Sequence, residues 1–283
     1  MTRPFLKMNG AGNDFVVVGA GRSSDHPAFA PAADIARAIA DRQTGVGCDQ
    51  LIGLDASRSG DVLMRIWNAD GGEVEACGNA TRCVGWLLME ASGRPEAVIE
   101  TKAGLVRASR AGPHAVTVDM GEPRLDWRDI PLAEDMDTAR VELQVGPIDA
   151  PLLHTPGCVS MGNPHVVFFV DEVDTETVIR VGSLIEHHPL FPEGVNVGFA
   201  QVLSSDRIRL RVWERGAGLT KACGTGACAA LVAAHRRGLA GRKAVMELDG
   251  GELTVEWRES DGHVLMTGPV EVEFSGVLPE RLS

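Results

Sequence analysis

Several short segments of the chain are typical of β-strands, because they either form an apolar run rich in β-branched residues or alternate between hydrophobic and polar residues. They are residues 15–18, 62–67, 115–120, 166–170, 208–213, 253–257 and 264–277. Two longer segments, about 79–91 and 225–237, are predicted helices. Each opens on a good N-cap residue, Asn79 or Thr225, and ends at a glycine, Gly93 or Gly238. The pattern predicts a mixed α and β chain with many strands and few helices.

An internal repeat organises these elements. Three blocks occur twice in the same order, and repeated blocks indicate a duplicated fold. The matched blocks are 12–17 with 162–167, 46–50 with 197–201, and 65–78 with 211–224. The third pair is the longest, and both copies run from arginine through tryptophan to an Ala-Cys-Gly sequence without a gap. We therefore expect two pseudo-symmetric halves of class α+β.

The length of 283 residues also favours two domains. A linker is expected near Gly121-Glu122-Pro123. The strand-like tail, 264–277, lies beyond the second repeat, and we assign its end to the first domain. The predicted domains are therefore residues 1–122 with 268–283, which carry Cys77, and residues 123–267, which carry Cys223.

Composition narrows the class of protein. The net charge of −12 argues against a nucleic-acid partner, because phosphate binding needs a basic face, although acidity also serves plain solubility. No apolar run reaches the roughly 18 residues of a membrane span, and the start lacks the apolar core of a signal peptide. A cytoplasmic protein with no membrane partner is expected.

Six cysteines are present, without the C-x-x-C spacing of common zinc sites or thiol redox proteins. We expect four of them to be small apolar core residues: Cys48, Cys83, Cys158 and Cys228. The other two, Cys77 and Cys223, occupy the same place in the two repeats, directly before a predicted helix. They are therefore the candidate catalytic thiols. An inactive disulfide between them is the alternative if they face each other.

A thiol at a helix N-terminus lies near the positive end of the helix dipole, which lowers the pKa of a cysteine. The same helix ends offer backbone N–H groups that bind carboxylates. Two such ends that meet at one substrate would place one cysteine on each side of an α-carbon. One thiolate then removes the α-proton and the other thiol returns a proton to the opposite face. The sequence therefore predicts a cofactor-independent amino-acid epimerase.

Two further polar groups stand near these thiols. Glu214-Arg215 occurs only in the second repeat, where the first has Asn68-Ala69. Arginine binds carboxylates bidentately, so Arg215 suggests a second charged group on the substrate, and the alternative is an ordinary ion pair. His165 is a candidate general base or a structural histidine.

Taken together, the motifs closely resemble those of the diaminopimelate epimerases, in family order and over nearly the whole chain. The matching segments are 9–15, 45–50, 68–71, 76–79, 162–165, 196–198, 214–218 and 222–226. The resemblance implies two domains, each a strand-rich barrel around a central helix. It also implies interconversion of LL- and meso-diaminopimelate in lysine and peptidoglycan precursor biosynthesis, with no metal and no pyridoxal phosphate. Homodimers are common in the family.

The resemblance assigns roles by motif position. Cys77 and Cys223 are the acid/base pair, and His165 and Glu214 assist proton handling. The remaining positions are implied to contact the substrate: Asn13, Gln50, Asn68, Gly78, Asn79, Asn163, Asn196, Glu214, Arg215, Gly224 and Thr225. The chain departs from many members at Leu219, where glutamate is common, and at Cys48. The rival interpretations are a related racemase for another amino acid, a non-catalytic amino-acid-binding protein and a thiol redox protein.

Overall fold

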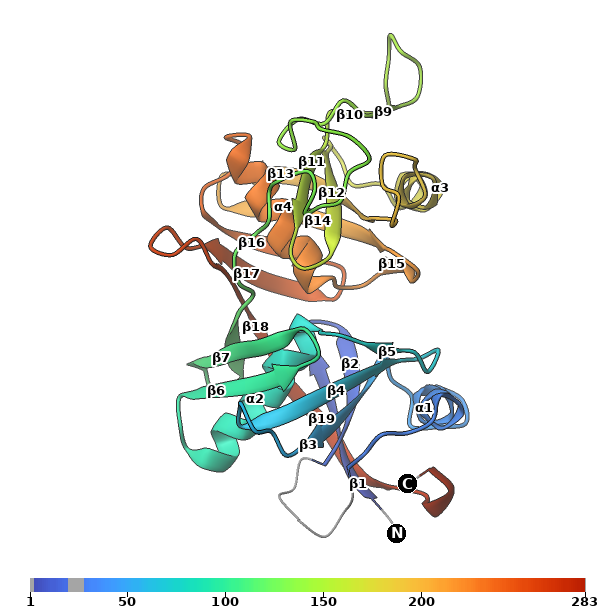
Figure 1. Cartoon of the computed structure of the whole chain (residues 1–283), viewed down its shortest axis with the longest axis vertical. Helices are drawn as coiled ribbons and strands as arrows, with labels where there is room; N and C mark the ends of the chain where they lie inside the picture. The colour runs from blue at the N-terminus through green and yellow to red at the C-terminus, as the bar shows by residue number, and fades with distance from the viewer. Residues whose placement is uncertain (1–2, 20–27, 283) are drawn as a thin grey trace. The chain divides into compact units, whose positions relative to one another are not determined.

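The computed structural model describes residues 3–19 and 28–282, and the chain divides into two compact units (Figure 1). Unit 1 comprises residues 1–119 and 267–283, and unit 2 comprises residues 120–266. Strands dominate both units, and a helix packs against the sheet in each. The predicted α+β class, with a barrel-like sheet around a central helix in each half, is confirmed.

Unit 1 contains most of the N-terminal elements and the end of the chain. They are β1 (Arg3–Gly10), β2 (Asn13–Val18), α1 (Ala33–Ala40), β3 (Gln50–Asp55), β4 (Val62–Asn68), β5 (Glu73–Val74), α2 (Gly78–Ser92), β6 (Glu96–Thr101), β7 (Gly104–Gly112), β8 (Ala115–Asp119), β19 (Glu271–Leu278) and the short 3-10 helix η1 (Glu280–Leu282).

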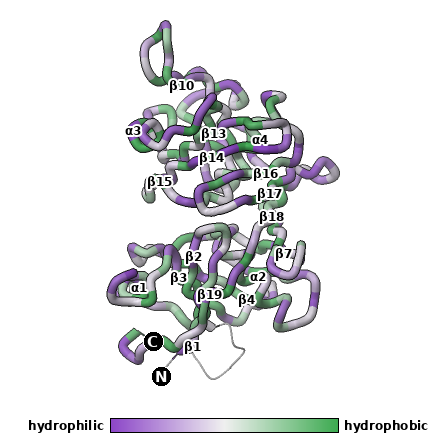
Figure 2. The backbone as a smooth tube through the Cα atoms, turned by 180° about the vertical axis from the view of Figure 1, so that it is seen from behind, coloured by the Kyte–Doolittle hydropathy of each residue, from purple (hydrophilic) through white to green (hydrophobic). Residues whose placement is uncertain are grey.

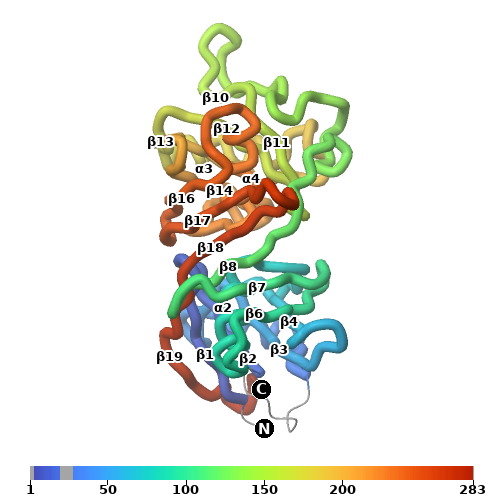
Figure 3. The backbone as a smooth tube through the Cα atoms, turned by 90° about the vertical axis from the view of Figure 1, so that its left-hand side faces the viewer, coloured from blue at the N-terminus to red at the C-terminus, as the bar shows by residue number. Residues whose placement is uncertain are grey.

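The sheet of unit 1 closes on itself. Hydrogen-bonded neighbours follow one another in the order β19, β1, β2, β3, β4, β6, β7 and β8. The pairs β2–β3 and β4–β6 are parallel. β8 pairs with β18 (Val264–Pro269), which leads directly into β19 and so completes the ring. Figure 3 shows the first strand, in blue, beside the last, in red.

The helix α2 provides the core of this ring. It contacts β1, β6, β7 and β8, and its residues from Asn79 to Gly85 are buried. Close packing needs glycine at position 85, because a Cβ there would lie 2.6 Å from Ala108 Cβ. A second apolar cluster, which includes Phe29, Ile39 and Trp67, fills the space between α1 and the sheet.

Unit 2 repeats this plan with its own elements. They are β9 (Gln144–Val145), β10 (Leu153–His154), β11 (Gly157–Ser160), β12 (Pro164–Phe169), α3 (Thr175–Glu186), β13 (Asn196–Ser204), β14 (Arg207–Glu214), β15 (Gly218–Thr220), α4 (Gly224–Arg236), β16 (Lys243–Leu248), β17 (Gly251–Trp257) and the start of β18.

Strand pairing in unit 2 matches that in unit 1. β11 pairs with β12, β12 lies parallel to β13, β13 pairs with β14, and β14 lies parallel to β16, which pairs with β17. The helix α4 corresponds to α2 and contacts β11, β12, β13 and β17. Its residues from Gly226 to Ala234 are buried, so the middle of this helix lies in the core. The predicted duplication of the fold is therefore confirmed.

The strand register corrects one of the matched blocks. Phe15 lies opposite Gln50 on the parallel pair of unit 1, and His165 lies opposite Asn196 on the parallel pair of unit 2. Since Phe15 and His165 are equivalent, Gln50 is equivalent to Asn196, and not to Gln201 as the match of 46–50 with 197–201 predicted. The sequence match was wrong because cross-strand partners, and not local similarity, set a register.

The loop between β9 and β10 projects from the body of unit 2, as Figure 2 shows, and Ile148 at this loop is 90% exposed. Within residues 3–19 and 28–282, no helix has the length and apolar character needed to cross a membrane.

Candidate active site

Cys77 is the N-cap residue of α2. Its backbone is extended (φ −149°, ψ 113°), its carbonyl accepts the N–H of Thr81 at 2.9 Å, and its sulfur accepts the N–H of Ala80 at 3.5 Å. The helix thus begins directly after the cysteine, as predicted. The prediction that Asn79 is the N-cap is wrong, because the cysteine itself fills that role and Asn79 lies in the first turn.

Two amides stand beside the Cys77 thiol. Asn13 Oδ1 lies 3.9 Å from Cys77 Sγ, within reach of a thiol hydrogen bond, and it accepts from Asn79 Nδ2 at 3.4 Å. Each amide is held from its other side. Asn79 Oδ1 accepts from Arg82 Nη1 at 2.8 Å, and Asn13 Nδ2 donates to Asp49 Oδ2 at 2.9 Å. Unit 1 therefore brings Asn13 and Asn79 to its cysteine.

Gln50 and Asn68 form a second polar pair in unit 1. They lie opposite each other on β3 and β4, and Gln50 Nε2 donates to Asn68 Oδ1 at 2.8 Å. Gln50 Oε1 is buried and has no hydrogen-bond partner within the described residues. A buried acceptor of this kind can take a hydrogen bond from a ligand.

Cys223 is the N-cap residue of α4, so it occupies the same place in unit 2. Its backbone is extended (φ −120°, ψ 106°), and its carbonyl accepts the N–H of Ala227 at 3.0 Å. Thr225, predicted as the N-cap, instead lies in the first turn, and its hydroxyl oxygen is 3.7 Å from Cys223 Sγ. Gly224, like Gly78 in unit 1, is the first residue of the helix.

The asparagine of unit 2 is oriented by different partners. Asn163 Nδ2 donates to Thr225 Oγ1 at 3.3 Å, and Asn163 Oδ1 bonds to His165 Nε2 at 3.0 Å. An acceptor oxygen requires that His165 donates from Nε2–H. His165 therefore reaches the thiol region through Asn163.

Asn196 connects the strand ends to the arginine that follows β14. Its Nδ2 donates to the Pro164 carbonyl at 3.0 Å, and its Oδ1 accepts the backbone N–H of Arg215 at 2.9 Å. Arg215 is exposed, and its Nη1 donates to the Glu193 carbonyl at 2.8 Å. The guanidinium is therefore held in place with further donors available.

The pKa of the Cys223 thiol differs from the value expected from the sequence. Its side chain is buried, and burial raises the pKa of the thiol well above its ordinary value. The nearby Glu214 carboxylate raises this pKa further, while hydrogen bonds to Gly226 and Thr225 oppose the change. The lowered pKa expected from the helix N-terminus is therefore wrong for Cys223, because desolvation of a thiolate outweighs the helix dipole.

Burial also governs the other titratable groups near the core. It lowers the pKa of His165 to about 3, with a smaller contribution from the positive charge of Arg215, so the ring is neutral. Burial raises the pKa of Cys48 and of Cys83 to about 12, and it raises that of Cys158 as well. These thiols and that of Cys228 are at most 1% exposed, as expected of apolar core residues.

Sequence reasoning missed the residues that support the site from behind. Asp49 and Arg82 each hold an asparagine beside Cys77, and the hydroxyl of Thr220 donates to Glu214. Asp49 adjoins Gln50 in a matched motif, which was the one available signal. Within the described part of the chain, no group of three or more histidine, cysteine or acidic side chains could hold a metal ion.

Among known proteins, the chain is similar to members of one enzyme family. A sequence model described as diaminopimelate epimerase matches residues 5–125 and 157–273. The chain is 65% identical to a diaminopimelate epimerase of Phenylobacterium zucineum over 99% of each chain. It is 61% identical to one of Caulobacter vibrioides over the full length of both, and 56% identical to one of Rhodospirillum centenum over 100% of this chain and 94% of that one.

Solved structures share the fold at low identity. A hydroxyproline epimerase from Agrobacterium vitis matches with a TM-score of 0.67 and 18% identity, over 98% of this chain and 91% of that chain. A PhzF-family phenazine biosynthesis protein from Enterococcus faecalis matches with a TM-score of 0.68 and 15% identity, over 99% and 100%. At these identities the likeness concerns the fold alone.

A duplicated fold with a cysteine at the start of each central helix, together with these relatives, defines an isomerase of the epimerase class. More narrowly, the chain belongs to the diaminopimelate epimerase family.

Proposed function

We propose that this protein interconverts LL- and meso-diaminopimelate by a two-base proton transfer between Cys77 and Cys223, in lysine and peptidoglycan precursor biosynthesis. The observation that carries the proposal is the N-cap position of one cysteine in each repeat, in a chain of this family. One cysteine from each repeat would serve one face of the α-carbon, so the duplication itself fits the chemistry.

The first turns of α2 and α4 would bind the substrate carboxylate at the reacting centre. The N–H groups of the first two residues of each helix have no intrahelical acceptors and lie at the positive end of the helix dipole. Gly78 and Asn79 would supply them in one repeat, and Gly224 and Thr225 in the other. As the α-proton leaves, negative charge grows on the carboxylate, where these donors stabilise it.

The proton step is balanced without a cofactor. The thiolate of one cysteine takes the α-proton, and the thiol of the other gives its proton to the opposite face of the same carbon. For Cys223 to act as the base it must first lose its own proton, and Glu214, which raises its pKa, is the neighbouring acceptor. His165 would assist through Asn163, the residue it bonds.

The far end of the substrate would meet the polar residues that differ between the repeats. Arg215 would bind the second carboxylate, since an anchored guanidinium pairs with carboxylates through parallel hydrogen bonds. Gln50 Oε1, which is buried without a partner in the described structure, would accept from an ammonium group. The remaining proposed substrate contacts are Asn13, Asn68 and Asn196.

A homodimer and a cytoplasmic location complete the proposal. Both rest on resemblance to the family and on the composition of the sequence. A racemase for another amino acid is the second candidate, and substrate choice in the test below separates the two.

The test is incubation of LL-diaminopimelate in deuterated water with the native protein and with Cys77→Ala and Cys223→Ala. The native protein should yield the meso isomer with deuterium at one α-carbon, and each variant should lose turnover by several orders of magnitude. Cys158→Ala, which removes a buried thiol outside the site, is the matched control and should remain active. Full activity of either site variant, or turnover of proline but not of diaminopimelate, would refute the proposal.

A further inference from the structure

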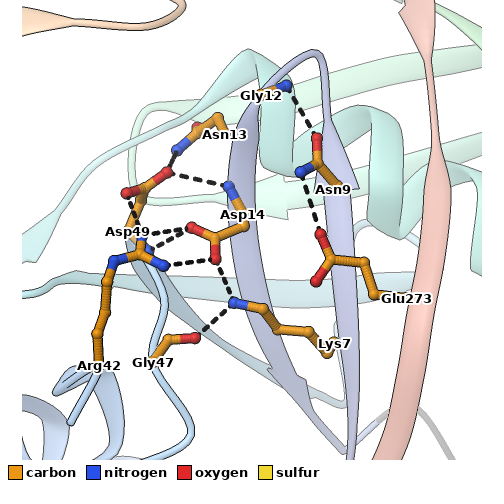
Figure 4. Close-up of polar contacts among 9 residues, drawn as sticks. All are labelled: Lys7, Asn9, Gly12, Asn13, Asp14, Arg42, Gly47, Asp49 and Glu273. Atoms are coloured by element: carbon orange, nitrogen blue, oxygen red, sulfur yellow. Dashed lines mark hydrogen bonds and ion pairs between the residues drawn. The ribbon is translucent and has the colours of Figure 1, made fainter. Parts of the chain in front are cut away.

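A network of charged side chains lies behind the Cys77 half of the site. Figure 4 shows Lys7, Asp14, Arg42 and Asp49 joined by hydrogen bonds and ion pairs. Lys7 is 4% exposed and bonds both Asp14 and the Gly47 carbonyl. Arg42 bridges the two carboxylates, at 2.8 Å to Asp14 Oδ1 and 2.7 Å to Asp49 Oδ1.

Asp49 is the member of this network that reaches the site. Its Oδ2 accepts from Asn13 Nδ2 at 2.9 Å and from the backbone N–H of Asp14 at 3.0 Å, while Oδ1 faces Arg42. An ionised carboxylate is only an acceptor, so the NH₂ group of Asn13 must face it. The amide oxygen then faces the other way, toward Cys77 Sγ at 3.9 Å.

Unit 2 contains the equivalent strands but lacks this carboxylate. The register that makes Gln50 equivalent to Asn196 makes Asp49 equivalent to Val195, which is fully buried. The fold therefore does not require an acid at this place. In the Asp49–Arg42 pair the two side chains are 42% and 58% exposed, and exposed ion pairs contribute little net stability. A carboxylate present at this place in one repeat only therefore indicates a task beyond folding.

The two asparagines present opposite ends to their cysteines. In unit 1, Asn13 directs its oxygen toward Cys77. In unit 2, His165 takes the oxygen of Asn163, so the NH₂ group faces Thr225, whose hydroxyl adjoins Cys223. One thiol therefore has a carbonyl acceptor beside it, and the other has a hydroxyl that receives an amide N–H.

We propose that Asp49 is a positioning residue that acts through Asn13 on Cys77: its carboxylate fixes the amide so that the amide oxygen accepts a hydrogen bond from the Cys77 thiol. This role rests on the proposed function of Cys77. The acceptor favours the protonated sulfur, so Cys77 is the thiol that is ready to donate when a carbanion forms. Asn79 Nδ2 also donates to this oxygen, at 3.4 Å, so Asp49 is the closer of two partners that hold the amide. Without Asp49 only the longer bond opposes a turn of the amide, and in the turned orientation its N–H groups favour the thiolate.

The experiment compares Asp49→Ala, Asp49→Asn and the native protein. The asparagine variant can keep an oxygen toward Asn13 and the backbone N–H of Asp14 while it loses the charge pair with Arg42. Asp261→Ala is the matched control, because Asp261 also pairs with one arginine and accepts one backbone N–H, from His263, outside the site. If Asp49→Ala does not fold, Asp49→Ser, whose side chain ends before the position of the Asp49 oxygens, replaces it.

Two readouts are taken. Turnover of LL-diaminopimelate gives kcat and KM, and iodoacetamide alkylation at about pH 8, near the pKa of an unperturbed thiol, gives the rates at Cys77 and Cys223 by peptide mass spectrometry. In Asp49→Ala, kcat should fall about tenfold, more than KM rises, and Cys77 should be alkylated up to about tenfold faster relative to Cys223, which is the scale of one hydrogen bond. Asp49→Asn should stay within about threefold of the native protein in both readouts.

The outcomes separate the positioning role from the proposed function. If Asp49→Ala matches Asp261→Ala in both readouts, or if Asp49→Asn is as impaired as Asp49→Ala, the positioning role is overturned. If the native protein does not act on diaminopimelate, the proposed function fails. In that case the alkylation rate of Cys77 relative to Cys223 still decides whether Asp49 sets the protonation state of the Cys77 thiol.

Discussion

The buried ring of His165 makes acid stability a direct test of the structure. The side chain is 1% exposed on β12, and burial, aided by Arg215, lowers its pKa to about 3 from the ordinary 6.5. The unfolded chain exposes the ring to water and binds a proton below pH 6.5, whereas the folded chain does not until pH is near 3. The stability that this residue contributes is therefore complete above pH 6.5 and is lost as pH falls from there toward 3.

The size of the effect follows from the same values. Within this window each pH unit removes about 1.4 kcal/mol from the free energy of unfolding. Between pH 7 and pH 5, His165 alone should therefore cost about 2 kcal/mol. Glutamine cannot titrate, and its amide nitrogen can replace Nε2 in the bond to Asn163. His165→Gln should accordingly lose about 2 kcal/mol less than the native protein over this interval.

The assay is urea unfolding followed by tryptophan fluorescence, at about pH 7 and about pH 5, for the native protein, His165→Gln and His154→Gln. His154 is exposed and meets water in the folded and unfolded chain alike, so its variant should behave as the native protein does. Carboxylates such as Glu73 and Asp261, with pKa values lowered to about 2 by their arginine partners, are common to all three proteins. An equal loss of stability in the native protein and His165→Gln would refute the assignment of a neutral, desolvated ring.

Three further predictions concern the charges and packing behind the site. Lys7→Met should lower the free energy of unfolding by about 2 kcal/mol, because Asp14 stays buried with only Arg42 as its cation, and urea unfolding measures the loss. Gly182→Ala should destabilise unit 2 by about 1–2 kcal/mol, since its Cβ would lie 2.5 Å from Trp213 Cγ; a melting temperature equal to that of the native protein would contradict the packing of α3. Glu214→Gln should lower the pKa of Cys223 while burial keeps it above the ordinary value, which the pH dependence of Cys223 alkylation reports; an unchanged profile would show that this carboxylate does not act on the thiol.

Local sequence was sufficient where local structure depends on neighbouring residues. The glycines after the two central helices and the cysteines before them marked α2 and α4, since helix starts and ends are set within one turn of the chain. The repeated Trp-to-Cys-Gly segments indicated the duplication for the same reason. These features placed both thiols, and the family motifs around them, on the correct elements.

Tertiary structure decided what depends on partners from elsewhere in the chain. The equivalence of Gln50 with Asn196 follows from cross-strand hydrogen bonds, which no local match encodes. The raised pKa of Cys223 follows from the burial of α4, which opposes and exceeds the helix dipole that the sequence suggested. The role of Asp49 likewise appears only when the parallel pairing of β2 with β3 brings Asn13 beside it, because the direction of an amide is set by the partner that it meets in space.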